Sequence, residues 1–144
     1  MPHISIVTLG VDDLRNVARF YEALGWRVSP ASVDGTVTFL QGDNIALSLF
    51  DRHGLAEDAH LAAGRPTGFR GVALATNVGS EEQVDETLRT ANRAGGRIRK
   101  AARHTDWGGY SGYFEDPEGH LWEVAYNPHF DLLDDGRISL PLGD

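Results

Sequence analysis

The most constraining feature of this sequence is an order of elements that occurs twice. An apolar, β-branched segment at residues 4–11 is followed by a helical pattern that ends at Gly25, and then by three further strand-like segments up to residue 50. A second apolar segment at residues 69–78 opens the same series, and its helical pattern ends at Gly95. Because an internal repeat determines the architecture, we expect an α+β fold made of two βαβββ modules.

The repeat divides the chain into modules and connections. The first module covers residues 4–50, a connector covers 51–68, the second module covers 69–126 and a C-terminal tail covers 127–144. Since the length is typical of one domain, we expect residues 1–144 to form a single domain. The apolar side chains of the tail are expected to pack on this domain or on a partner chain.

Charge and composition exclude several classes of function. The net charge of −8 argues against binding to nucleic acid or to an anionic membrane surface. No apolar run approaches the roughly 18 residues of a spanning helix, and no secretory signal is recognisable, so a cytoplasmic protein is expected. The absence of cysteine excludes disulfides, thiolate metal sites, iron–sulfur clusters and cysteine nucleophiles.

Two motifs give the repeat a family resemblance. The first helix carries Asp-Leu at 13–14 and Phe-Tyr-Glu-Ala-Leu-Gly-Trp at 20–26, and the last hairpin carries Tyr-Phe-Glu-Asp-Pro-Glu-Gly-His-Leu-Trp-Glu-Val at 113–124. Together, over residues 4–128, the chain resembles the vicinal oxygen chelate superfamily, which includes glyoxalase I, extradiol dioxygenases and bleomycin-resistance proteins. The resemblance implies two modules whose curved sheets pair around a cleft. In the metal-dependent members, that cleft holds one divalent ion.

The resemblance also implies four positions for metal ligands, and this chain keeps one residue able to bind a metal. Glu123 matches the ligand position of the last strand. The other three positions fall on Ile6, on Ser48 (Leu47 if the register slips by one) and on Ala73 or Gly71. His3 is three residues from Ile6 and projects to the opposite face of a regular strand. Because one carboxylate does not make a tight transition-metal site, we predict no metal and no other cofactor; a divalent metal is the disfavoured alternative.

Glu123 lies between Trp122 and Val124 in an otherwise apolar strand. One interpretation is a structural carboxylate that is satisfied by a nearby Arg, Tyr or backbone N–H, since buried charges must be paired. The other is a general base, or an acceptor that orients a ligand in the cleft. The residues alone leave both open.

Six further residues are candidates for ligand binding: Trp107, Tyr110, Tyr113, Trp122, Asn77 and His104. The four aromatic side chains predict either core packing or a pocket that stacks on a planar ligand. Asn77 ends an apolar strand and either caps the following turn or points into the cleft. His104, two residues before Asp106, belongs either to a solvated loop or to an acid–base pair.

The sequence therefore predicts a small-molecule-binding protein that resembles glyoxalases and bleomycin-resistance proteins but lacks the family metal. An organic ligand is expected in an aromatic cleft near Glu123. The alternative is an enzyme of the same superfamily, such as a lyase, an isomerase or a dioxygenase-like protein, with Glu123 as a base or as one metal ligand. A third hypothesis is an interaction module without chemistry. A homodimer is expected, and no nucleic acid or membrane partner.

Overall fold

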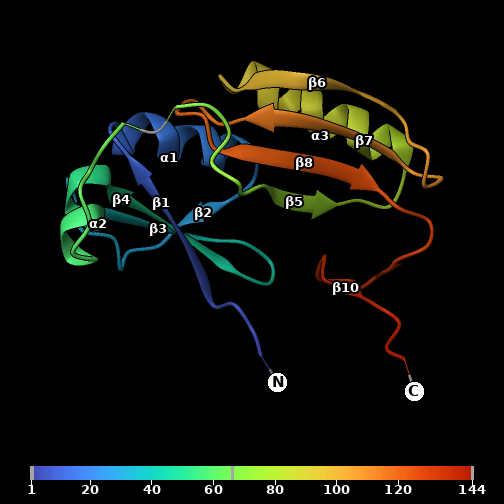
Figure 1. Ribbon diagram of the computed structural model, residues 1–144, viewed down its shortest axis with the longest axis horizontal. Coiled ribbons are helices and arrows are strands. Elements are labelled where there is room, and N and C mark those ends of the chain that lie inside the picture. Colours follow the sequence, from blue (N-terminus) through green and yellow to red (C-terminus); the bar gives the residue numbers. More distant parts are fainter. Residues whose placement is uncertain (1, 66, 144) are drawn as a thin grey trace. The chain divides into compact units, whose positions relative to one another are not determined.

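Two compact units, residues 1–72 and 73–144, make up the chain (Figure 1), and the computed structural model describes residues 2–65 and 67–143. The first unit contains β1 (Ile6–Val11), α1 (Leu14–Ala23), β2 (Arg27–Val28), β3 (Val37–Gln41), β4 (Ala46–Asp51) and α2 (Arg52–Asp58). The second unit contains β5 (Leu74–Asn77), α3 (Glu81–Arg93), β6 (Arg97–His104), β7 (Tyr110–Glu115), β8 (Leu121–Tyr126), β9 (Asp131–Leu132) and β10 (Ile138–Ser139).

The two four-stranded sheets have equivalent topologies. Their strand orders are β1-β4-β3-β2 and β5-β8-β7-β6. In each sheet the first strand pairs in parallel with the last strand of its module, and the remaining pairs are antiparallel. The α+β prediction of two βαβββ modules is therefore confirmed, with α2 as an additional helix after the first module.

In the first unit, α1 begins and ends at residues that the sequence indicates. The Asp13 side chain accepts a hydrogen bond from the Asn16 N–H at 3.0 Å, which satisfies an otherwise unpaired donor of the first turn. Gly25 has a φ of +104°, a conformation that favours glycine, and the chain leaves the helix there. The helix buries Val17, Ala18, Phe20 and Tyr21, and the sheet buries Leu40, Leu47 and Leu49.

In the second unit, α3 has the predicted capping box. The Ser80 hydroxyl accepts from the Gln83 N–H at 3.2 Å, and the Gln83 side chain accepts from the Gly79 N–H at 2.7 Å. Figure 1 shows α3 along one side of the second sheet, and it packs against β6, β7 and β8. The core between helix and sheet consists of Val84, Leu88, Ala91, Phe114, Trp122 and Val124.

Gly112 on β7 provides the space for this packing. A Cβ atom built there would lie 2.8 Å from Leu88 Cδ1, 2.8 Å from the Lys100 carbonyl oxygen and 3.0 Å from the Ala102 nitrogen. Because two of these neighbours are backbone atoms, we expect Gly112→Ala to lower the free energy of unfolding by about 1–3 kcal/mol. Urea unfolding measures the loss. Gly64→Ala is the control, since a Cβ at Gly64 meets no atom within 4 Å. Equal stability of the two variants would contradict the packing described.

The C-terminal tail differs from the expectation. It forms a short antiparallel hairpin, β9 with β10, which the sequence pattern did not predict. Its large apolar side chains are exposed rather than packed on the domain: Phe130, Leu132, Leu133, Ile138, Leu140 and Leu142. For Phe130, Leu132, Leu133, Ile138 and Leu140 this exposure does not favour packing on the domain, and packing on a partner chain stays a prediction. Among the described residues, no helix has the length and apolar character needed to cross a membrane.

Candidate functional site

Strand alternation gives the second sheet two chemically different faces. One face packs against α3, because a Cβ at Gly112 would contact Leu88 of that helix. Val124 pairs with Gly112 and Trp122 pairs with Phe114, so these side chains share the α3 face. Glu123, between Trp122 and Val124, therefore lies on the opposite face, which we call the Glu123 face.

The register of the strands defines what else lies on the Glu123 face. It places Ala75, Glu123, Tyr113 and Lys100 in one cross-strand row and Asn77, Ala125, Ser111 and Arg103 in another. Glu123, Tyr113 and Asn77 are partly exposed, and Lys100 and Arg103 are exposed. These two rows therefore present a carboxylate, a phenol, an amide and two cations.

Tyr113 is the immediate cross-strand partner of Glu123. Burial raises the pKa of Tyr113 above its ordinary value of 10.0, and the negative charge of Glu123 and a hydrogen-bonding interaction with that carboxylate raise it further. Around neutral pH, Tyr113 is therefore a protonated donor beside an acceptor. This pairing gives the Glu123 carboxylate the tyrosine partner that the sequence analysis left open.

The raised pKa of Tyr113 gives a titration test. In Glu123→Gln the neighbouring charge is gone, so the pKa of Tyr113 should fall toward 10.0. Tyrosinate absorbance measures this, and Tyr113→Phe identifies which transition belongs to Tyr113. Asp85→Asn is the control: it should lower the pKa of Tyr110, which is raised first by its hydrogen bond to Asp85, and leave Tyr113 unchanged.

The same pKa shifts fix the direction of the stability change in alkali. A folded-state pKa above the unfolded value means that the folded chain holds its proton longer, so stability falls as pH rises from about 10 through the folded pKa. A pKa of Tyr113 that stays unchanged in Glu123→Gln would show that the two side chains do not interact.

The other candidate residues lie elsewhere. The Trp122 ring is buried and stacked on Phe114, with centroids 6.0 Å apart and an interplanar angle of 4°. The Tyr110 hydroxyl donates a hydrogen bond to Asp85 of α3 at 2.7 Å. His104 forms an ion-pair contact with Glu81 of α3, and its ring lies against that of Tyr110.

The four predicted aromatic residues therefore do not share one face. Trp122 and Tyr110 point to the α3 side, and Trp107 lies in the β6–β7 loop with 44% of its surface exposed. The structure brings together Glu123, Tyr113 and Asn77, and it separates them from Trp122, Tyr110 and His104. Sequence reasoning missed Lys100 and Arg103, which join the first group through the register of β6.

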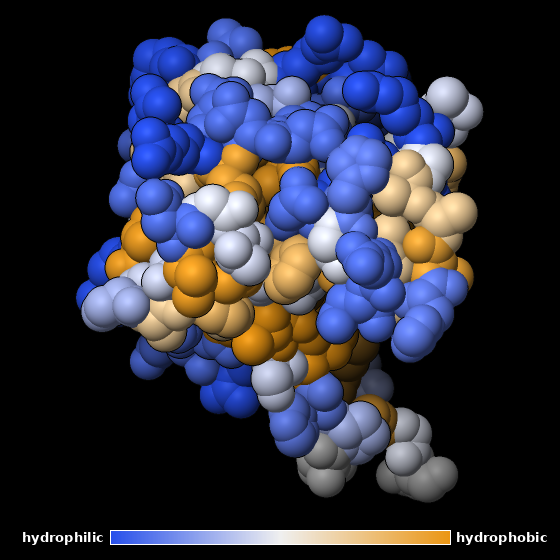
Figure 2. All heavy atoms as spheres, turned by 90° about the vertical axis from the view of Figure 1, so that its left-hand side faces the viewer, coloured by the Kyte–Doolittle hydropathy of each residue, from blue (hydrophilic) through white to orange (hydrophobic). Residues whose placement is uncertain are grey.

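The family's metal-ligand positions do not fit a metal in this chain. Ile6 at the start of β1 has a hydrocarbon side chain, and 47% of its surface is exposed. Figure 2 shows that apolar residues also lie among the hydrophilic ones at the surface. Ser48 on β4 is buried, and Gly71 and Ala73 precede β5. Within the described ranges 2–65 and 67–143, no group of three or more His, Asp or Glu side chains is arranged to hold a metal ion. A hydrocarbon or a glycine donates no electron pair from its side chain, so Ile6, Gly71 and Ala73 supply no metal ligand.

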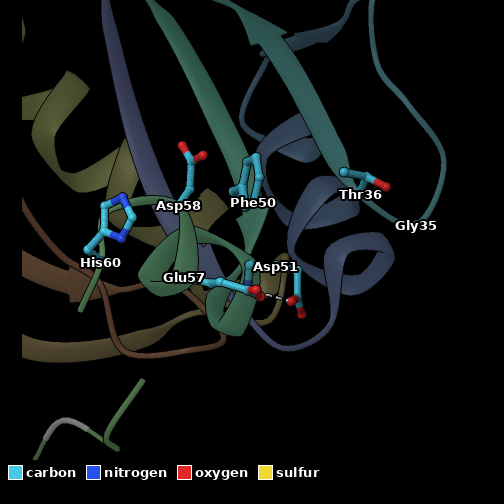
Figure 3. Close-up of a pocket in the computed structure, with 8 residues that line it drawn as sticks. Gly35, Thr36, Phe50, Asp51, Glu57, Asp58 and His60 are labelled. Atoms are coloured by element: carbon cyan, nitrogen blue, oxygen red, sulfur yellow. Dashed lines mark hydrogen bonds between the residues drawn. The ribbon is translucent and has the colours of Figure 1, made fainter. Parts of the chain in front are cut away.

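The first unit contains an open pocket of about 520 Å³ near α2 (Figure 3). It is lined by Gly35, Thr36, Phe50, Asp51, Gly54, Glu57, Asp58 and His60. Its most buried carboxylate, Asp51, caps α2 by accepting a hydrogen bond from the Gly54 N–H at 2.9 Å. Asp51 therefore has a structural role, and the side chains of Glu57, Asp58 and His60 are exposed.

Comparison with known proteins places the chain in a family. The model of the glyoxalase/bleomycin resistance protein/dioxygenase superfamily matches residues 2–124. The chain belongs to this superfamily. A search of curated proteins found no match. Among solved structures, a glyoxalase-related enzyme from Fulvimarina pelagi is 33% identical with a TM-score of 0.85, and the match covers 99% of this chain and 100% of that one.

Two other solved structures are less similar to this chain. A glyoxalase/bleomycin resistance protein/dioxygenase from Nocardioides is 25% identical with a TM-score of 0.75, covering 99% of this chain and 91% of that one. A lactoylglutathione lyase from Agrobacterium tumefaciens is 23% identical with a TM-score of 0.65, covering 87% and 93%, and this likeness extends to the fold alone. Since one fold of this kind serves several functions, the function must be argued from the site.

Proposed function

We propose that this superfamily member binds a small organic molecule on the Glu123 face of its second sheet and does so without a divalent metal. The observation that carries the proposal is the Glu123–Tyr113 pair, which is partly exposed on that face. The face has a carboxylate acceptor beside a phenol donor, and the Asn77 amide lies in the neighbouring row. A small number of polar groups arranged in this way can orient a ligand.

The donor set at the family's metal positions supports the metal-free part of the proposal. Glu123 has a side chain that can ligate a divalent ion, whereas Ile6, Ala73 and Gly71 do not, and a serine hydroxyl is a weak neutral ligand. Recognition of a ligand needs affinity alone, which hydrogen bonds and apolar contact can supply.

A catalytic role of the same site is the second candidate, favoured by the contact of an acceptor with a donor. In that role Glu123 takes a proton from the bound substrate, and Tyr113 donates a hydrogen bond to the negative charge that develops on it. Both residues lie on neighbouring, paired strands, which hold their separation fixed. Solvent-exchange NMR of bound substrate protons distinguishes catalysis from binding, because a protein that only binds leaves the exchange rate unchanged.

The proposal is tested by a thermal-shift screen of chelator-treated protein against planar aromatic acids, their esters and antibiotics. A ligand that binds the folded state raises the melting temperature by mass action. We expect at least one class to raise it in the presence of the chelator. If every class fails with chelator and one succeeds after metal is added back, the metal-free proposal is wrong.

A further inference from the structure

We propose that the ligand of the Glu123 face is an anion: a small organic molecule with a carboxylate or phosphonate group held by Lys100 and Arg103 of β6. This inference rests on the proposed function and narrows it to a class of ligand. It comes from the irregular register of one edge strand, which changes the chemistry of the face.

Two irregularities in β6 bring cations to this face. A regular strand alternates, so Lys100 and Arg103 would point to opposite sides of the sheet. The register against β7 shifts between Ile98 and Lys100 and again between Lys100 and Arg103, and each shift places one additional residue on β6. As a result Lys100 pairs with Tyr113 and Arg103 pairs with Ser111, both on the Glu123 face.

Lys100 and Arg103 differ from their neighbour Arg99 in how their charges are paired. Arg99 forms an ion pair with Glu115 at 3.3 Å. In contrast, Lys100 and Arg103 have no carboxylate within ion-pair distance among the described residues. In a chain of net charge −8, residues 97–103 hold four of the 13 basic side chains. A local positive field on an acidic protein favours an anion at this place over the rest of the surface.

The separation between Lys100 and Glu123 suits a ligand with an acidic group at one end. Lys100, Tyr113 and Glu123 lie on three adjacent strands, in that order. Since neighbouring strands are about 4.8 Å apart, the backbones that carry Lys100 and Glu123 are roughly 10 Å apart. An acidic group of the ligand at Lys100 thus leaves its remaining atoms beside Tyr113 and within reach of Glu123. A ligand with negative charge at its other end would be repelled by Glu123.

Lys100 is the only lysine in the sequence, which gives the experiment a single reporter. Reductive ¹³C-methylation keeps the positive charge and labels only Lys100 and the N-terminal amine. We would titrate labelled, chelator-treated protein with benzoate and phenylphosphonate, and with methyl benzoate as the uncharged probe. The acids should shift the Lys100 signal and bind about tenfold more tightly than the ester, a difference of about 1.4 kcal/mol.

Variants separate this inference from the function on which it rests. The double variant Lys100→Gln and Arg103→Gln should weaken acid binding, measured by calorimetry, about tenfold and leave ester binding unchanged. Arg89→Gln on the exposed side of α3 is the matched control and should change neither. If ester and acid bind equally and Glu123→Gln weakens both, the anion inference is wrong and the proposed function stands. If no probe of either class binds, the proposed function fails and the inference with it.

Discussion

Replacing Glu123 with Gln is expected to reduce strongly the ligand-induced rise in melting temperature while leaving the fold intact. Glutamine has nearly the shape of glutamate, but it lacks the charge and one acceptor oxygen that the site presents beside Tyr113. A hydrogen bond to a charged group contributes about 1.5–3 kcal/mol, which corresponds to a loss of affinity of roughly tenfold to 150-fold. Calorimetric titration of a ligand from the thermal-shift screen measures the change.

The control for this substitution is Glu86→Gln, which makes the same chemical change at an exposed position of α3. Both variants should melt within about 1–2 °C of the parent without ligand, since exposed or partly exposed substitutions of this kind cost little. If Glu123→Gln keeps both its fold and its affinity for the ligand, the ligand binds away from the Glu123 face.

Replacing Asp116 with Ala is expected to cost about 3–5 kcal/mol of folding free energy, because it leaves two backbone N–H groups and the His120 ring without their buried hydrogen-bond partner. Asp116 is 3% exposed and lies in the turn between β7 and β8. Its Oδ1 accepts hydrogen bonds from the backbone N–H groups of Glu118 at 2.9 Å and of His120 at 3.0 Å. Its Oδ2 lies 2.6 Å from Nδ1 of His120. The carboxylate thus holds the turn together from both ends.

The expected loss lowers the melting temperature by roughly 10 °C, at about 2–4 °C for each kcal/mol in a protein of this size. Asp135→Ala is the control. Asp135 also accepts from a backbone N–H and contacts the side chain of Arg137 at 2.6 Å, but it does so in the tail at a partly exposed position. We expect that variant to lose less than about 0.5 kcal/mol. Similar losses in both variants would contradict the role given to burial of Asp116.

Much of the fold could be predicted from local signals in the sequence. Gly25 and Gly95 end the two long helices, and the Ser80–Gln83 capping box starts the second one. The turn at residues 116–119 was also predictable, because Asp and Gly are typical turn residues. The Asp116 side chain accepts a hydrogen bond from the Glu118 N–H, and the Asp116 carbonyl oxygen accepts one from the Gly119 N–H. The hairpin in the tail was not predicted, since its strands have only two residues each and carry no alternating pattern.

The grouping of the candidate site was harder to predict. Trp122 and Glu123 are adjacent in one strand, so they must point to opposite faces, and the same parity separates Tyr110 from Tyr113. That signal was available from spacing alone. The position of Lys100 was not, because it depends on an irregularity in the pairing of β6 with β7 between Ile98 and Lys100. Register is a tertiary property, and composition does not encode it.

A ligand site that works without metal calls for a measurement of binding together with metal content. Untagged, chelator-treated protein would be analysed for metals and titrated by calorimetry with a ligand from the screen, before and after addition of Zn²⁺, Ni²⁺, Mn²⁺ or Fe²⁺. We predict binding at one ligand per chain with metal far below one per chain, and no gain in affinity when metal is added. Stoichiometric metal that is required for binding and lost in Glu123→Gln would contradict it.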